Sequence, residues 1–281
     1  MNAPFTPPFL IVNPKAYLGS ADTLKLATLT DELAGRFGID VIFTAQHVDL
    51  RMVAEATGNL TVTAQHMDPI VKGRGMGFIL PDSLVEAGCR AVVLNHAEHP
   101  LELAVLDATM ARAREVGLLT VVCADTAAQC RAVANLGPDM MICEPTANIG
   151  TGQLDAGDYI ERTTRIVKEV NPAILVIQAA GVTSAADIDR VLAQGADGSG
   201  GTSGIVQHPD WRGLLTEMCT VIARRRANPA YPLPPGPRRS TRLRSANRAS
   251  PPRHIERQSH DHRTTRGARP RRAAQHGAGS G

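Results

Sequence analysis

Residues 140–152 read MMICEPTANIGTG, a short apolar run followed by a polar segment, and short apolar runs recur along the rest of the chain. The apolar run 140–143 predicts a short buried strand, which places one carboxylate, Glu144, at its end. Pro145 stiffens the exit from this strand, and the polar segment up to Gly152 has the composition of a mobile lid. The stretch therefore fits a general base beneath a lid, although a solvated Glu at an ordinary strand-to-helix turn has the same local pattern.

Short apolar runs and longer amphipathic stretches alternate on both sides of this strand. The apolar runs predict strands at 9–13, 41–45, 60–64, 91–95, 119–123, 140–143 and 174–179. The amphipathic stretches predict helices that include 22–37, 101–116, 127–136, 159–170 and 185–193. A glycine often closes the helix before the next strand, at Gly38, Gly88, Gly117, Gly137 and Gly195. Units in this order predict parallel strands joined by right-handed crossovers.

A doubtful eighth strand at 195–201 completes eight units within about 225 residues, which predicts an α/β fold with a compact (β/α)8 barrel. An open doubly wound sheet is the alternative. Such a sheet normally has a Gly-rich turn after its first strand, whereas here the first strand runs into Asn13-Pro14-Lys15. The segment 195–201, GADGSGG, lacks branched apolar side chains. We expect its glycines to let the backbone approach a ligand closely.

Charge divides the chain into two parts. The whole chain of 281 residues carries +3, whereas residues 227–281 hold twelve arginines, two acids and no lysine and so carry +10, which leaves −7 for residues 1–226. The second part has almost no large apolar residues, so we predict a disordered tail at 227–281. Residues 1–226 are long enough to bury a sizeable core and form the predicted barrel domain.

The sequence predicts a cytoplasmic protein that needs no metal or other cofactor. Its five cysteines are odd in number and show no CxxC spacing, which favours free buried thiols in a reducing compartment. No basic, apolar leader begins the chain, and no apolar run approaches the ~20 residues of a membrane span. Basic tails bind nucleic-acid phosphates, but this tail has Tyr231 as its one aromatic residue, so nucleic acid is the less favoured partner.

The active site of such a barrel forms where the strands end. Loops after the last two strands commonly bind phosphate through backbone N–H groups. Gly181, Thr202, Ser203 and Gly204 are at these loops, and Gly150 on the predicted lid adds a donor. We therefore expect a small phosphorylated substrate.

Four side chains at strand ends predict the chemistry. Glu144 offers a base, Lys15 a cation, and Asn13 and His96 hydrogen-bond donors. Such a set suits proton abstraction next to a carbonyl, with the enediolate oxygens stabilised by fixed donors. Taken singly, each side chain has an ordinary alternative as a surface lysine, a core histidine or a turn former.

With these residues in place, the chain resembles the triosephosphate isomerase family, whose fold is the TIM barrel, in its short archaeal form. The resemblance covers about residues 9–226. It rests on Asn13-Pro14-Lys15, on Leu94-Asn95-His96-Ala97-Glu98, on Glu144-Pro145 with Ile149-Gly150-Thr151-Gly152, and on the segment 64–81.

The resemblance implies that these residues have the roles established for the family. Glu144 would move a proton between two carbons, and neutral His96 would polarise the carbonyl. Lys15 would stabilise the developing negative charge, and Asn13 would orient Lys15. A lid at 145–152 would exclude water. The loop at 65–81 would dock into a second subunit, which implies a homodimer or homotetramer.

Some residues depart from the family pattern. Ala97 replaces a serine whose hydroxyl would contact the resting base, and Pro14 replaces a bulkier residue. These changes leave the proton-transfer groups intact but leave open an isomerase or epimerase acting on another small sugar phosphate. A barrel that has lost catalysis is a separate alternative, which the retained Asn13, Lys15, His96 and Glu144 oppose. A metal-dependent epimerase is a further alternative that rests on two repeated segments, 44–49 and 63–68, with their His47 and His66. Epimerase chemistry would need an acid on the seventh strand, and the sequence has none there.

Overall fold

The computed structural model describes residues 5–154 and 157–228. Most of the segment for which we predict a disordered tail, residues 227–281, lies outside the described part of the chain. The last described helix, α9, is Trp211–Arg226. Within the described residues, no helix has the length and apolarity to cross a bilayer.

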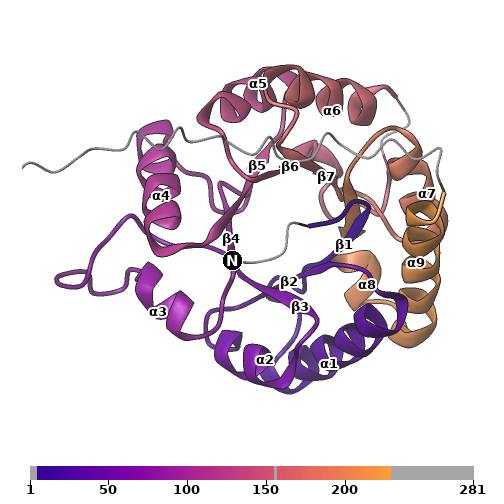
Figure 1. Cartoon of the computed structure of the whole chain (residues 1–281), viewed down its shortest axis with the longest axis horizontal. Coiled ribbons are helices and arrows are strands. Elements are labelled where there is room, and N and C mark those ends of the chain that lie inside the picture. The colour runs from indigo at the N-terminus through magenta and orange to yellow at the C-terminus, as the bar shows by residue number, and fades with distance from the viewer. Residues whose placement is uncertain (1–4, 155–156, 229–281) are drawn as a thin grey trace, which may run out of the picture. The chain divides into compact units, whose positions relative to one another are not determined.

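Eight parallel strands form a closed barrel in the order of the sequence, β1 to β8 (Figure 1). The predicted (β/α)8 barrel is therefore confirmed, and the open sheet is excluded because β1 pairs with β8. The strands are β1 Phe9–Val12, β2 Val41–Ala45, β3 Leu60–Ala64, β4 Ala91–Leu94, β5 Leu119–Ala124, β6 Met140–Cys143, β7 Leu175–Gln178 and β8 Gly198–Gly201.

Helices surround this ring of strands (Figure 1). They are α1 Ser20–Phe37, α2 Leu50–Ala56, α3 Pro81–Glu86, α4 Leu103–Val116, α5 Ala127–Leu136, α6 Tyr159–Val170, α7 Ala185–Ala193, α8 Ser203–Val206 and α9, with a 3₁₀ turn at Thr146–Asn148. The sequence gives no range for α2 or α3, because seven and six residues are too few to show a helical period, although Gly88 indicates that a helix ends before β4. Gly38 and Gly117 end their helices in the left-handed conformation, as predicted.

The glycines of β8 make room for β1. Phe9 and Ile11 lie in the barrel interior and pair in register with Gly198 and Gly200. A Cβ on Gly198 would lie 2.6 Å from the Phe9 ring, and one on Gly200 would lie 1.8 Å from the Ile11 carbonyl oxygen. The expectation that these glycines serve a ligand is therefore corrected for Gly198 and Gly200, whose close neighbours belong to β1. A large side chain on one strand fills the space that its neighbour leaves empty.

Gly198→Ala will therefore lower the free energy of unfolding by about 1–3 kcal/mol, because the added methyl must displace the Phe9 ring. Urea unfolding measures the change. Gly58→Ala is the matched control, because no atom lies within 4 Å of its Cβ position, and its effect should stay within about 0.5 kcal/mol. Equal effects at the two positions would contradict this account of β8.

The cysteines match their predicted state. All five are buried and free.

Candidate functional site

Side chains from several strands meet in a cavity of about 170 Å³ at the carboxyl ends of the barrel. All but one of the predicted site residues line it: Asn13, Lys15, His96, Glu144, Gly150, Gly181, Thr202 and Ser203. Gly204 follows Ser203 in α8 but does not line the cavity, and a Cβ on it would lie 2.4 Å from the Val182 carbonyl oxygen. Segments distant in sequence meet here because parallel strands end at one edge of the barrel.

Glu144 and His96 face each other across this cavity. Oε1 of Glu144 lies 3.4 Å from Nε2 of His96, and both side chains are largely buried. The backbone N–H of Glu98 donates to Nδ1 of His96 over 3.1 Å. A neutral imidazole in this position therefore carries its proton on Nε2, the nitrogen that faces Glu144.

The two groups have shifted pKa values. Burial, and then the nearby Lys15 ammonium, lower the pKa of His96, so its ring is neutral at pH 7. Burial raises the pKa of Glu144 to about 7, to which the Glu98 and Asp125 charges add, while Lys15 opposes the rise. The pair thus combines a carboxylate of raised basicity with a neutral hydrogen-bond donor, which is the combination that proton transfer at carbon needs.

Lys15 is held in an uncommon backbone conformation, with φ of 46°. Its N–H donates to Asn13 Oδ1 over 3.0 Å, and its carbonyl accepts from Gln65 Nε2 over 3.1 Å. Its ammonium lies 2.8 Å from Glu98 Oε1. Left-handed non-glycine residues persist where neighbouring groups hold them, and they concentrate at functional sites. The amide of Asn13 thus orients Lys15, and the Thr44 hydroxyl bonds to the same Asn13 oxygen.

Asn95 plays a comparable part before His96. It also has positive φ, 59°, which asparagine tolerates better than most residues. Its Nδ2 donates to the Cys123 carbonyl over 3.0 Å, and its Oδ1 accepts from the Leu101 N–H over 2.9 Å. The predictions from sequence did not assign a role to Asn95 or Thr44. Their positions at strand ends were the available signal.

The backbone after β7 and β8 borders the cavity at Gly181, Thr202 and Ser203. Gly181 has φ of 77°, and a Cβ there would lie 2.0 Å from the Gln153 carbonyl oxygen, so the chain directly after the lid packs on this turn. Within the described part of the chain, the N–H groups of Ser203 and Gly204 at the start of α8 have no backbone or side-chain acceptor. Free N–H groups at such a turn suit an anionic ligand.

Ala97 and Glu144 line a second cavity, of about 440 Å³, behind the carboxylate. Position 97, where a serine hydroxyl would be expected from the family pattern, thus lines a cavity that the base also lines. A third cavity, of about 630 Å³, lies on the other flank of Lys15 and His96 and is lined also by Phe78. The loop 65–80 borders this cavity and ends in exposed apolar side chains, with Met76 fully and Phe78 58 % exposed.

The residues that suggested a metal site do not form one. Nε2 of His47 lies 2.7 Å from the His66 carbonyl oxygen, and His66 Nε2 lies 3.4 Å from Asp68 Oδ1. Across residues 5–154 and 157–228, no three His, Cys, Asp or Glu side chains are grouped so that they could hold a metal ion. The metal-dependent epimerase therefore has no support from these residues.

Comparison with known proteins gives one consistent family. The model of the triosephosphate isomerase family matches residues 8–218. Triosephosphate isomerase of Methanothermus fervidus is 32 % identical over 218 residues, which are 76 % of this chain and 98 % of the relative. The enzyme of Methanocaldococcus jannaschii is 33 % identical over 76 % of this chain and 99 % of its own length, and that of Methanopyrus kandleri is 36 % identical over 75 % and 96 %.

Proposed function

The chain belongs to the triosephosphate isomerase family, and we propose that it interconverts glyceraldehyde 3-phosphate and dihydroxyacetone phosphate through an enediolate. The observation that carries the proposal is the placement of Glu144 and His96 3.4 Å apart in a cavity that Lys15 also lines. The three relatives described above are all named triosephosphate isomerase, and the match covers almost their whole length.

Glu144 is the base in this proposal. From aldehyde to ketone, its carboxylate takes the proton from C2 and returns it to C1. Nε2–H of His96 gives a proton to the oxygen on C1, and the ring then recovers one from the oxygen on C2. The neutral ring supported by the Glu98 N–H suits this exchange, because its Nε2 proton points toward Glu144 and the cavity.

Lys15 and the backbone turns bind the charged parts of the substrate. The Lys15 ammonium stabilises the negative oxygen that develops in the enediolate, and Asn13 holds Lys15 in place. The substrate phosphate is received by the N–H groups near Gly181, Thr202, Ser203 and Gly204, with Gly150 added from the lid. Closure of the lid at 145–152 excludes water from the reacting atoms.

The direct test is turnover of glyceraldehyde 3-phosphate by the full chain in a coupled assay. Strong turnover supports the proposal. A folded protein that turns over another small aldose or ketose phosphate, but not this one, would move the substrate assignment to that compound.

The activity should fall as the pH drops through about 7. Ionised Glu144 is the active form, so kcat/KM should decline about tenfold per pH unit below the raised pKa of about 7 and level off above it. Because the substrate phosphate also titrates, near pH ~6, Asp125→Asn provides the control. The Asp125 charge raises the pKa of Glu144, so this variant should move the midpoint to lower pH. An unmoved midpoint would assign the decline to the substrate.

We also propose that two copies assemble through the 65–81 loop, as a dimer or within a tetramer. The exposed tip at Met76 and Phe78 is an apolar surface of the kind that marks an interface. The cavity of about 630 Å³ beside Lys15 and His96 offers it a place in a second copy. Light scattering after gel filtration tests this, and a monomer at micromolar concentration would contradict it.

A cytoplasmic location, and a division into a barrel at 1–226 and a tail at 227–281, complete the proposal. Five free, buried cysteines support a reducing compartment. Retained turnover after deletion of 227–281 would support the division, and lost turnover would oppose it.

A further inference from the structure

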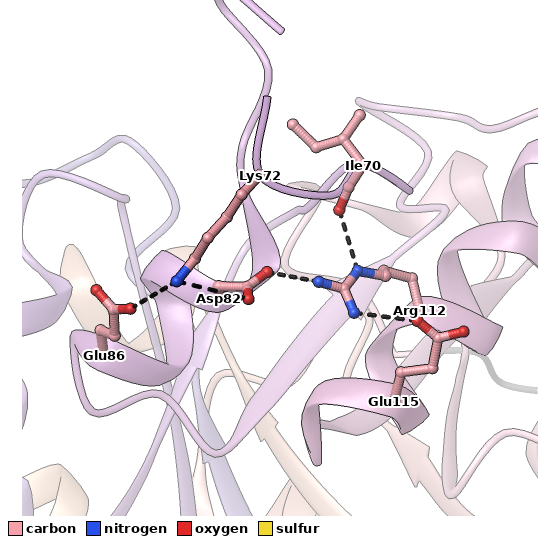
Figure 2. A network of polar contacts seen from close by, with 6 residues as sticks. All are labelled: Ile70, Lys72, Asp82, Glu86, Arg112 and Glu115. Carbon is pink, nitrogen blue, oxygen red and sulfur yellow. Dashed lines mark hydrogen bonds and ion pairs between the residues drawn. The ribbon is translucent and has the colours of Figure 1, made fainter. Parts of the chain in front are cut away.

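An arginine of α4 holds the base of the 65–81 loop, which joins β3 to α3. Arg112 of α4 donates from Nε to the Ile70 carbonyl over 3.0 Å, and its Nη2 lies 2.5 Å from Asp82 Oδ2 (Figure 2). Its Nη1 donates to Glu115 over 3.0 Å on the same helix. The guanidinium therefore connects the loop, α3 and α4 at one point, and its side chain is only 15 % exposed.

A second cation extends this network. Nζ of Lys72 lies 4.0 Å from Asp82 Oδ1 and 3.5 Å from Glu86 Oε1, so Asp82 receives both Lys72 and Arg112 (Figure 2). The two arms of the loop also bond to each other. The N–H of Asp68 donates to the Ile79 carbonyl over 3.1 Å, and the Ile79 N–H donates to Asp68 Oδ2 over 2.6 Å.

Among the described residues, the tip at 73–78 has a single hydrogen bond, within the tip itself, from the Phe78 N–H to the Gly75 carbonyl over 3.1 Å. It extends beyond the ring of helices between α3 and α4 (Figure 1), and its Met76 and Phe78 are exposed. A tied base with an apolar tip is the arrangement expected of a segment that is shaped before it binds. Ordering a loop in advance removes an entropic cost from association.

We infer that Arg112 is a positioning residue for the active site of a second copy of this chain. By fixing the base of the 65–81 loop, Arg112 presents the tip so that it enters the other copy's cavity beside Lys15 and His96. This inference rests on the proposed function and its assembly. It adds that the cation which shapes each site lies on α4 of the neighbouring copy, and contacts no substrate.

Arginine is required for this task because the three bonds leave the guanidinium in fixed, planar directions. An ammonium at position 112 keeps the charge but cannot meet the Ile70 carbonyl, Asp82 and Glu115 together. Arg112→Lys should therefore behave more like Arg112→Leu than like the parent. The matched control is Arg131→Leu, which removes an exposed arginine paired with Glu169 between α5 and α6.

The first measurement is self-association of the full chain by sedimentation, with specific activity followed on dilution. We expect Arg112→Leu to weaken association about ten- to a hundredfold, so that its activity falls at concentrations where the parent and Arg131→Leu keep theirs. Trypsin should also cut the variant faster at Lys72 or Arg74 within the loop. Unchanged association and unchanged cleavage in a folded variant would overturn the inference.

The decisive experiment mixes two defective proteins. Arg112→Leu keeps its base but presents a loosened loop, whereas Glu144→Gln keeps its loop but lacks the base. In a mixed dimer, the Arg112→Leu site receives the intact loop, so the mixture should exceed the summed activities of the two proteins at least severalfold. No gain in a mixture shown to form hetero-oligomers would mean that the loop acts within its own subunit, and would overturn the inference. An inactive parent would instead refute the proposed function.

Discussion

Glu144→Gln will lower kcat for triose phosphate isomerisation by at least about 10²–10⁴-fold, the contribution of a positioned general base. Glutamine keeps the size and hydrogen-bonding capacity of the side chain at the end of β6 but cannot accept the carbon-bound proton. The N–H of residue 144 will still bond to the Ala124 carbonyl, which continues the β5–β6 pairing. KM should change little, because the phosphate is bound elsewhere.

The same substitution should stabilise the fold at alkaline pH. A carboxylate whose folded pKa is raised from 4.5 to about 7 contributes stability below pH ~4.5 that is lost as the pH rises through 7. Removing the charge should therefore raise the free energy of unfolding by up to about 3 kcal/mol at pH 8, with little change at pH 4.5. Urea unfolding at the two pH values measures the difference.

Glu169→Gln is the control for both effects, because Glu169 is an exposed carboxylate paired with arginines on the protein surface. Its activity and its stability at pH 8 should remain near those of the parent. Activity of Glu144→Gln within tenfold of the parent would remove Glu144 from the mechanism. An unchanged free energy of unfolding at pH 8 would mean that burial does not raise the pKa of this carboxylate.

The parts of the fold that sequence predicted best are those encoded locally. Strand 140–143 and helices 127–136 and 159–170 have the predicted bounds, because apolar runs and helical periods lie within each segment. β8 was doubtful for a non-local reason. Its glycines compensate for Phe9, which lies far away in sequence but pairs in register with Gly198.

The candidate site also has a part that the sequence predicts and a part that depends on non-local contacts. Glu144, His96 and Lys15 could be placed together because the ends of parallel strands share one edge of the barrel. The groups that hold them could not be assigned, since Thr44 reaches Asn13 across 31 positions and Gln65 reaches Lys15 across 50. Supporting contacts depend on tertiary geometry, which no sequence period records.

Lys15→Met should reduce kcat/KM about 10²–10³-fold or more, because removing one preorganised group that faces a developing negative charge has about this effect. Methionine keeps the length and apolar stem of lysine and removes the ammonium that lies 2.8 Å from Glu98. Lys25→Met is the control, because Lys25 is an exposed lysine paired with Asp22 on α1. Its kinetic constants should match those of the parent.

The pH profile of Lys15→Met separates an electrostatic role from a structural one. Lys15 lowers the pKa of both Glu144 and His96, so its loss should raise both values. The midpoint of the residual activity should then move above pH 7, because Glu144 must lose its proton against less positive charge. A variant with low activity but an unmoved midpoint would indicate that Lys15 maintains the shape of the cavity rather than its potential. A shifted midpoint together with an unchanged unfolding transition would locate the effect in the charge itself.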